Sequence, residues 1–216
     1  MWSRLKQFLG VIPDFPDFDE VIRALHGDVV KRNFLFHILI IMFECVMVIS
    51  ISMRPGGPFA KPRRVTYFVL YLVLILAAAG VTWLETWIDR KKQADYRLYF
   101  RAEAVFLGFF SLWGVAVTLN DQLGGNGLTV YNYVVLILAI MSMMKPWQAA
   151  LLFLADFILL NGLLPCFPDP AGLDNSFNNL MNSLFPTLAA AAVAASLYNS
   201  KLQAKRNEII IRRQYR

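Results

Sequence analysis

The sequence predicts an all-α polytopic membrane protein, a six-transmembrane-helix bundle with an N-terminal amphipathic helix and a C-terminal cytoplasmic connector helix. Its 216 residues are 57% hydrophobic with a mean hydropathy of +0.50, whereas soluble domains are only about 45–50% apolar. Long apolar runs recur along the chain, and each approaches or exceeds the roughly 17–25 residues that cross a bilayer as a helix. The runs are continuous and not alternating, so they do not fit a transmembrane β-barrel.

Residues 1–32 are predicted to form a cytoplasmic amphipathic segment. Its apolar residues recur at helical spacing next to Arg4 and Lys6, which is typical of a helix lying in the membrane surface; an unstructured tail is the alternative. Asp17 and Glu20 have the spacing of a capping box, so we expect a helix that begins at Phe18 and continues into the first span. The apolar residues are Trp2, Leu5, Phe8 or Leu9, and Ile12.

Residues 33–199 are predicted to hold six transmembrane helices. The fourth and fifth apolar runs are the shortest, so four or five spans are the alternative. Pro186 lies inside the sixth run, where its missing backbone N–H favours a kink. The runs cover about 33–53, 66–88, 100–120, 129–144, 147–164 and 180–199.

The positive charges predict that both termini are cytoplasmic. Of the 21 Lys and Arg residues, seventeen lie in segments that this orientation places inside. The other four lie in the first outer loop, where they either reach lipid headgroups or attract an anionic ligand. The net charge of +6 therefore reflects topology and contact with membrane lipid, and we expect no nucleic-acid partner. The four cations of the outer loop are Arg54, Lys61, Arg63 and Arg64.

Two carboxylates lie deep in the predicted spans, Glu44 in the first and Asp156 in the fifth. A charged side chain at that depth costs about 2.5–3.5 kcal/mol, so each should face other helices. His37 shares a face of the first span with Glu44 but lies about 10.5 Å from it along the helix axis. Two interpretations stay open: protonated acids that hydrogen-bond to neighbouring helices, or a proton- or cation-responsive site.

The sixth span has one face of small and polar residues at intervals of three and four. Because small residues let helix backbones approach closely in lipid, we expect this face to pack against other helices. The face comprises Asn175, Asn178, Asn182, Phe185, Ala189, Ala192, Ser196 and Asn199.

Polar residues also gather at the outer ends of several spans, where a bundle would bring some of them together. Tyr and Asn supply donors, acceptors and ring faces suited to a small polar ligand. Ordinary interfacial residues and helix caps are the alternative explanation. The predicted ligand-binding residues are Tyr131, Asn132, Asn161, Asn178 and Asn182.

The sequence contains no recognisable catalytic, cofactor or metal motif. It has no Gly-rich phosphate loop and no Ser/His/Asp set. Its two histidines, His26 and His37, lack metal-ligand spacing, and Cys45 and Cys166 are predicted too far apart for a disulfide. We therefore expect no cofactor, no metal and no enzymatic activity from these residues.

Residues 200–216 are predicted to carry the last span into the cytoplasm as a connector helix, because no Gly or Pro interrupts "NSKLQAKRNEIIIRRQYR". Leu197, Ala204 and Ile211 recur every seven residues, with polar residues between them. This weak heptad is what a dimeric connector helix would show. A basic tail next to the membrane is the alternative.

Four segments, "RPGGPF", "WGVAVTLNDQLGGNGLTVYNY", "MMKPWQAALL" and "NSFNNLMNSLFPTLAAAAVAASLYNSKLQAKRNEI", resemble the six-helix N-terminal sensor region of bacterial, clostridial-type diguanylate cyclases and related signalling receptors. The resemblance covers essentially the whole chain. It implies a sensor domain at 33–199 in the bacterial cell membrane, whose last helix drives a cytoplasmic output domain, in cis or in trans, as a homodimer. The chain contains no GGDEF motif and no kinase core, so it would be an excised input domain or a stand-alone protein.

These observations favour a sensory input domain. An unknown small ligand or a membrane property would shift the packing of the fifth and sixth spans, with Glu44 and Asp156 as coupling residues. The second hypothesis is a small proton- or cation-coupled transporter or channel that uses the same two acids. The third is a structural membrane anchor that needs no pocket.

Overall fold

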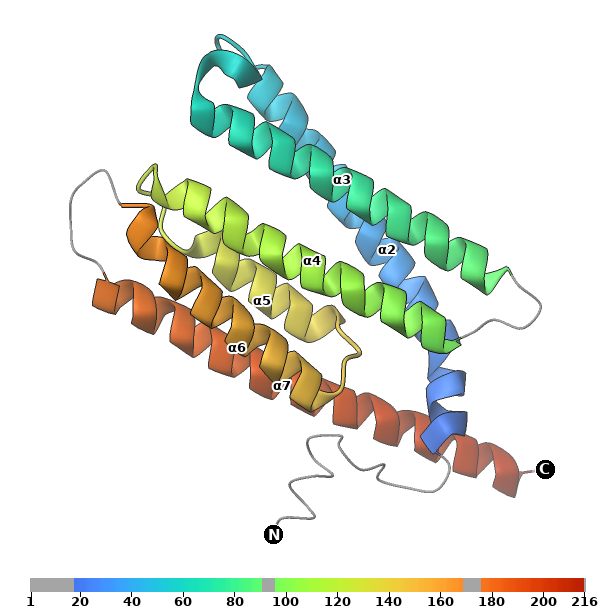
Figure 1. The fold of residues 1–216 in the computed structure, drawn as a ribbon. Helices are drawn as coiled ribbons and strands as arrows, with labels where there is room; N and C mark the ends of the chain where they lie inside the picture. Colours follow the sequence, from blue (N-terminus) through green and yellow to red (C-terminus); the bar gives the residue numbers. More distant parts are fainter. Residues whose placement is uncertain (1–17, 91–95, 169–175, 216) are drawn as a thin grey trace.

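The computed structural model describes residues 18–90, 96–168 and 176–215, and within these ranges the chain is helical with no strand. Six α-helices and two short 3-10 helices follow one another (Figure 1). They are α2 (Phe18–Ser52), η1 (Pro58–Ala60), α3 (Pro62–Asp89), α4 (Tyr96–Gln122), α5 (Thr129–Met141), α6 (Pro146–Leu163), η2 (Leu164–Cys166) and α7 (Ser176–Gln214).

The helices alternate in direction along the bundle, so their ends gather in two groups. We call the end that contains Phe18, Asp89 and Gln214 the inner end, and the opposite one the outer end. The α2–α3 hairpin packs against α4, and α4, α5, α6 and α7 lie side by side (Figure 1). The inner part of α2 also contacts α7, so the first and last helices of the described chain meet.

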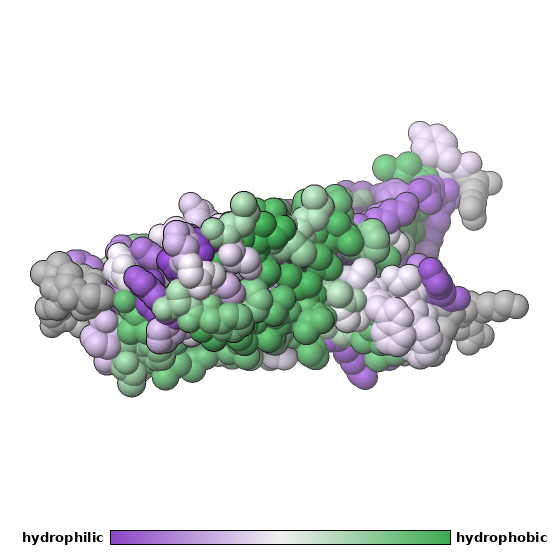
Figure 2. All heavy atoms as spheres, turned by 90° about the horizontal axis from the view of Figure 1, so that it is seen from above, coloured by the Kyte–Doolittle hydropathy of each residue, from purple (hydrophilic) through white to green (hydrophobic). Residues whose placement is uncertain are grey.

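The helices indicate a membrane location. Five of them, all except α5, are long and apolar enough to cross a bilayer, and α5 is a shorter apolar helix of 13 residues. Large apolar side chains cover the outside of the bundle; on α2 alone, Phe34, Leu39, Met42 and Phe43 are at least half exposed. Figure 2 shows hydrophobic residues over the middle of one face and hydrophilic ones mostly towards its ends.

The core of the bundle is built around α4, the most buried of the five long helices. Phe36 of α2 packs edge-on against Phe110, whose ring stacks on Trp113 with centroids 5.6 Å apart. The indole nitrogen of Trp113 donates a hydrogen bond of 3.0 Å to the Leu70 carbonyl on α3. Aromatic packing and one interhelical hydrogen bond therefore tie α2, α3 and α4 together, as expected where lipid supplies no hydrophobic driving force.

Part of the cationic outer loop serves the structure of that loop. Arg64 donates to the Pro55 carbonyl at 2.8 Å, and Arg63 contacts the Tyr67 hydroxyl. The Arg63 guanidinium also lies directly against Gly124, where an added Cβ would meet its atoms at about 2 Å. A side chain at position 124 would therefore displace the flexible end of Arg63 from its present place.

The packing face predicted for the last span is wrong. α7 does pack against α5 and α6, but through Ser183, Thr187, Ala190 and Ala194, which are buried. Asn178, Asn182, Phe185, Ala189, Ala192 and Ser196 are exposed instead, and Asn175 lies outside the described residues. The reason is that "LAAAAVAAS" places small residues all round the helix, so composition did not determine which side faces its neighbours.

α7 remains one helix through Pro186 and runs beyond it for many turns. At the other end of the chain, α2 begins at Phe18, the residue at which the sequence predicts a helix start. The predicted cap Asp17 and the predicted amphipathic helix both lie outside the described residues.

Candidate functional sites

A polar pocket of about 400 Å³ lies at the outer end between α5 and α7. Asn132 and Asn182, two of the predicted ligand-binding residues, line it together with Thr129 and Pro186. The Oδ1 atom of Asn132 is buried and has no hydrogen-bond partner among the described residues. Because Pro186 has no N–H, the backbone carbonyl of Asn182 also loses its usual helical donor. The pocket thus offers acceptors that a ligand with N–H or O–H groups could satisfy.

The other three predicted ligand residues do not line this pocket. Tyr131 is fully buried and its hydroxyl is 2.8 Å from that of Thr187 on α7. Asn161 donates to the Ser183 hydroxyl at 3.0 Å and to its own helix. Asn178 is exposed. Tyr131 and Asn161 therefore join α5 and α6 to α7, as interhelical hydrogen bonds do in membranes.

The predicted coupling residues Glu44 and Asp156 are both buried, as their depth in the spans requires. Asp156 on α6 accepts a hydrogen bond from the Ser111 hydroxyl on α4. Glu44 on α2 has an Oε2 atom that is buried without a hydrogen-bond partner among the described residues. Asp156 therefore fits the interpretation of an acid that is hydrogen-bonded to a neighbouring helix. Glu44 is buried in the same way, but its Oε2 atom has no such bond among the described residues.

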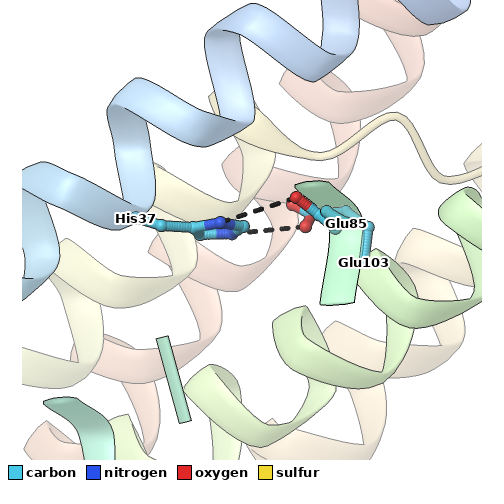
Figure 3. Close-up of side chains that lie close together, drawn as sticks. All are labelled: His37, Glu85 and Glu103. Carbon is cyan, nitrogen blue, oxygen red and sulfur yellow. Dashed lines mark ion pairs between the residues drawn. The ribbon is translucent and has the colours of Figure 1, made fainter. Parts of the chain in front are cut away.

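A second polar site, which the sequence analysis did not predict, lies between α2, α3 and α4 towards the inner end. We call it the His–Glu–Glu cluster; it consists of His37, Glu85 and Glu103. The Nδ1 atom of His37 lies 3.7 Å from Glu85 Oε2, and Nε2 lies 3.3 Å from Glu103 Oε2. Figure 3 shows the imidazole directed towards the two carboxyl groups, which lie side by side. One ligand atom from each residue falls within 4.8 Å of the others.

The cluster is shielded from solvent and incompletely hydrogen-bonded. Relative exposure is 0% for His37, 4% for Glu85 and 3% for Glu103. The two ring nitrogens of His37 have no partner within hydrogen-bond geometry among the described residues. When both glutamates are ionised, the same is true of both carboxylate oxygens of Glu103 and of Oε1 of Glu85; a protonated carboxyl group would instead allow a hydrogen bond between Glu85 and Glu103. Phe106 packs edge-on against the imidazole with ring centroids 4.6 Å apart. Polar groups left in this state are costly in a low-dielectric interior.

Arg32 interacts electrostatically with Glu103 of this cluster. Its guanidinium is already engaged, because Nη2 donates to the Met141 carbonyl at 2.8 Å and to Asn33 at 3.3 Å. One partly committed guanidinium faces two buried carboxylates. The cluster therefore has a deficit of positive charge, which bound protons or a bound cation would correct.

A cavity of about 390 Å³ opens at the inner end and reaches Glu103. Asp19 and Phe100 line it from the starts of α2 and α4, and Lys145 lines it from the turn before α6. Glu103 is thus a lining residue of the cavity, while its two buried carboxylate oxygens belong to the His–Glu–Glu cluster. The cavity ends next to the cluster.

Sequence reasoning missed the cluster because its members lie on three different helices. Glu85 and Glu103 fall near the inner ends of two apolar runs, where acidic residues are ordinary boundary residues. A search for ligand spacing within one helix cannot detect residues that meet only through helix packing. The one available signal was that all three sit at a similar depth from the predicted inner boundary.

Comparison with protein-family models, with curated proteins and with solved structures gave no match for the chain. The arrangement of the two sites therefore carries the functional argument. The outer pocket can bind a small polar molecule, and the inner cluster can hold positive charge.

Proposed function

We propose that this chain is a sensory input module of a bacterial cell membrane, with six spans and both termini in the cytoplasm. A stimulus at the bundle is relayed through α7 to a cytoplasmic output domain of the diguanylate cyclase type, in cis or in trans. The observation that carries the proposal is α7 itself, a single helix from the outer pocket to the inner end.

The length of α7 suits a relay. Its 39 residues correspond to about 58 Å at 1.5 Å per residue, while the hydrocarbon core of a bilayer is about 30 Å thick. Asn182 and Pro186 at its outer part line the pocket, and Arg212 and Arg213 lie in its last turn. A rotation or displacement at the pocket would therefore reach the cytoplasm through one rigid rod, with 200–216 as the connector.

A contact between α2 and α7 supports movement of the two helices as a pair. Leu25 and Val29 of α2 belong to a buried apolar cluster that also contains Tyr198 and Leu202 of α7. Beyond this cluster the Lys205 ammonium lies 2.9 Å from the Asp28 carboxylate, and Arg213 pairs with Glu20. The packing of the first span would therefore influence the connector helix.

The stimulus would act by preferring one packing of α5, α6 and α7 over another, since a ligand shifts an equilibrium only through its differential affinity for the two states. Asn132 and Asn182 are the proposed ligand contacts. Asp156 is the proposed coupling residue on α6, through its hydrogen bond with Ser111, and Glu44 is the proposed one on α2.

A homodimer is part of the proposal, with a second copy of α7 as the partner surface. The exposed face of α7 continues into the connector, where the heptad residues Ala204 and Ile211 are also exposed while Leu202 faces α2. Small residues such as Ala189 and Ala192 on this face would let two α7 helices approach closely. The face that sequence analysis assigned to packing within the bundle would then pack between copies.

A phase scan of the connector tests the relay. A diguanylate cyclase output domain is fused after Gln214 with zero to seven inserted alanines, each of which rotates the following helix by about 100°. We expect cyclase activity in membranes to rise and fall with a period of three to four residues, because a rigid helix transmits rotational phase.

The matched control replaces the alanines with Gly/Ser linkers of equal length, which transmit no phase and should give flat activity. Membrane abundance is measured for each fusion by immunoblot. An alanine series as flat as the Gly/Ser series would rule out relay through α7. It would leave the transporter and the structural anchor as the remaining interpretations.

The transport hypothesis has one observation in its favour, the buried and unpartnered Oε2 atom of Glu44. Proton or cation flux into proteoliposomes that disappears in Asp156→Asn or Glu44→Gln would support it. Against it, α2 and α6, which carry these two acids, are continuous helices, whereas transporters commonly interrupt helices at their ion sites.

A further inference from the structure

We propose that the His–Glu–Glu cluster is a binding site for a divalent transition-metal ion, with Zn²⁺ and Mn²⁺ as the best-suited ions. The ligands would be an imidazole nitrogen of His37 and one carboxylate oxygen each from Glu85 and Glu103. This inference goes beyond the proposed function, because the chain can bind a metal ion at this position whether or not α7 relays a signal.

The geometry is close to that of a three-ligand metal site. Ligand atoms about 2.1 Å from a zinc ion are up to about 4 Å apart, and in the cluster they lie within 4.8 Å of one another. Rotations of the two glutamate side chains would close the difference without movement of the helices. The Nε2 atom of His37 is nearer to a carboxylate than Nδ1 is, at 3.3 Å against 3.7 Å, so we assign Nε2 as the ligand nitrogen.

Burial and charge give an independent reason to expect a metal ion at the cluster. His37 is completely buried and neither of its ring nitrogens has a hydrogen-bond partner among the described residues. The same is true of both carboxylate oxygens of Glu103. A divalent cation would neutralise the two carboxylates and accept the imidazole lone pair at once, whereas a hydrogen bond between Glu85 and Glu103 leaves the imidazole nitrogens without a partner.

The ligand types select the class of ion. Imidazole with carboxylates suits Zn²⁺, Fe²⁺ and Mn²⁺, whereas Ca²⁺ and Mg²⁺ prefer sites made only of oxygen ligands. No thiolate is present, because both cysteines lie elsewhere and are exposed, so a Cu⁺ site is disfavoured. Three protein ligands leave a coordination position for water or a further ligand.

The inner cavity supplies the route by which the ion would enter. It is lined by Glu103 and opens where Asp19 and Lys145 lie. Arg97 and Arg101 also line it, so the entrance is not uniformly acidic. Ion selection would therefore take place at the cluster and not at the entrance.

Direct metal analysis tests the inference. The untagged full chain, with Cys45→Ser and Cys166→Ser to remove thiol binding, is purified in detergent, stripped with a chelator and loaded with Zn²⁺ or Mn²⁺ alone. Bound metal is measured by elemental mass spectrometry after gel filtration, and affinity by competition with a fluorescent chelator. We expect one ion per chain, and a loss of affinity of at least about 10-fold in Glu85→Gln and in Glu103→Gln.

Glu208→Gln is the control, because Glu208 is a glutamate on α7, outside the cluster and outside both proposed sites. It should keep one ion per chain. Circular dichroism and gel filtration without metal check that each variant folds. Should a glutamine variant not fold, X-ray absorption of the zinc-loaded parent decides, with one imidazole and otherwise oxygen ligands as the expected shell.

Three results would overturn the inference. The parent protein could bind no stoichiometric metal, which would leave protons as the neutralising charge. Binding could persist when His37→Gln, Glu85→Gln and Glu103→Gln are combined in a folded protein, which would identify an adventitious ion elsewhere. Glu208→Gln could also weaken binding as much as Glu103→Gln does.

Discussion

At the scale of single residues, polar side chains inside this apolar bundle connect neighbouring helices. The Ser111–Asp156 hydrogen bond joins α4 to α6, Tyr131–Thr187 joins α5 to α7, and Asn161–Ser183 joins α6 to α7. An unpaired polar group in such an interior costs about 1–3 kcal/mol, so each pair specifies one arrangement of its two helices.

Residues of the outer end should separate into structural and ligand-facing ones when substituted. Tyr131→Phe removes the hydrogen bond to Thr187 and should lower the free energy of unfolding by about 1 kcal/mol, while Asn182→Ala, on an exposed face, should leave it unchanged within about 0.5 kcal/mol. Reversible unfolding in detergent followed by circular dichroism measures both. Equal destabilisation by the two changes would mean that Asn182 is structural and not ligand-facing.

The candidate sites were only partly predictable from these residue types. Asn132 and Asn182, two of the five predicted ligand residues, line one pocket, because α5 and α7 both begin at the outer end; ligand binding by them stays a prediction. Tyr131 and Asn161 are polar residues like Asn132 and Asn182, but they lie on the sides of α5 and α6 that face α7 and contact that helix instead of the pocket. His37, Glu85 and Glu103 were missed because their contact depends on the relative rotation of three helices, which sequence spacing within each helix does not determine.

At the scale of elements, the inner contact between α2 and α7 combines apolar packing with ion pairs. Hydrogen bonds to Asp28 and Glu208 raise the pKa of Lys205, and the Lys205 ammonium lowers the pKa of Glu208. The Lys205–Glu208 pair within α7 therefore persists through neutral pH; it is lost as pH falls through the lowered Glu208 value or rises through the raised Lys205 value. The carboxylates of the ion pairs are exposed, so the contribution of the pairs to stability is small.

Leu202 should therefore matter more than Lys205 for the α2–α7 contact. Leu202 is 2% exposed, and Leu202→Ala should lower the free energy of unfolding by about 2–5 kcal/mol through lost contacts and a cavity. Lys205→Ala should cost at most about 1 kcal/mol. Hydrogen exchange at the connector measures local opening in both variants. A larger effect of Lys205→Ala would show that charge, and not packing, holds α2 against α7.

The helices were more predictable than their faces. Each of the six α-helices of the described residues contains one of the predicted apolar runs, or nearly all of it, because run length and hydrophobicity are properties of the sequence itself. The extension of α7 to Gln214 also followed from the uninterrupted sequence. The buried face of α7 could not be predicted from the sequence, because Ala residues occur on every side of this helix. Ser183 and Thr187 gave no further signal, since their hydroxyls donate hydrogen bonds to carbonyls of their own helix.

At the scale of the whole molecule, α5 decides how many times the chain crosses the membrane. Its 13 residues give about 20 Å of helix, short of the roughly 30 Å of hydrocarbon. α5 packs against both α4 and α7, so protein rather than lipid can cover the backbone at its ends. We therefore propose that α5 is a span, which would make the total six and would place both ends of the described chain on one side.

Cysteine accessibility on intact cells tests this topology most directly. On a background of Cys45→Ser and Cys166→Ser, single cysteines at Asn126, Lys145 and Gln214 are treated with a membrane-impermeant maleimide before and after permeabilisation. We predict that Asn126→Cys is labelled on intact cells, and that Lys145→Cys and Gln214→Cys are labelled only after permeabilisation. Labelling of Lys145→Cys on intact cells would show that α5 does not cross, and external labelling of Gln214→Cys would contradict an α7 that enters the cytoplasm.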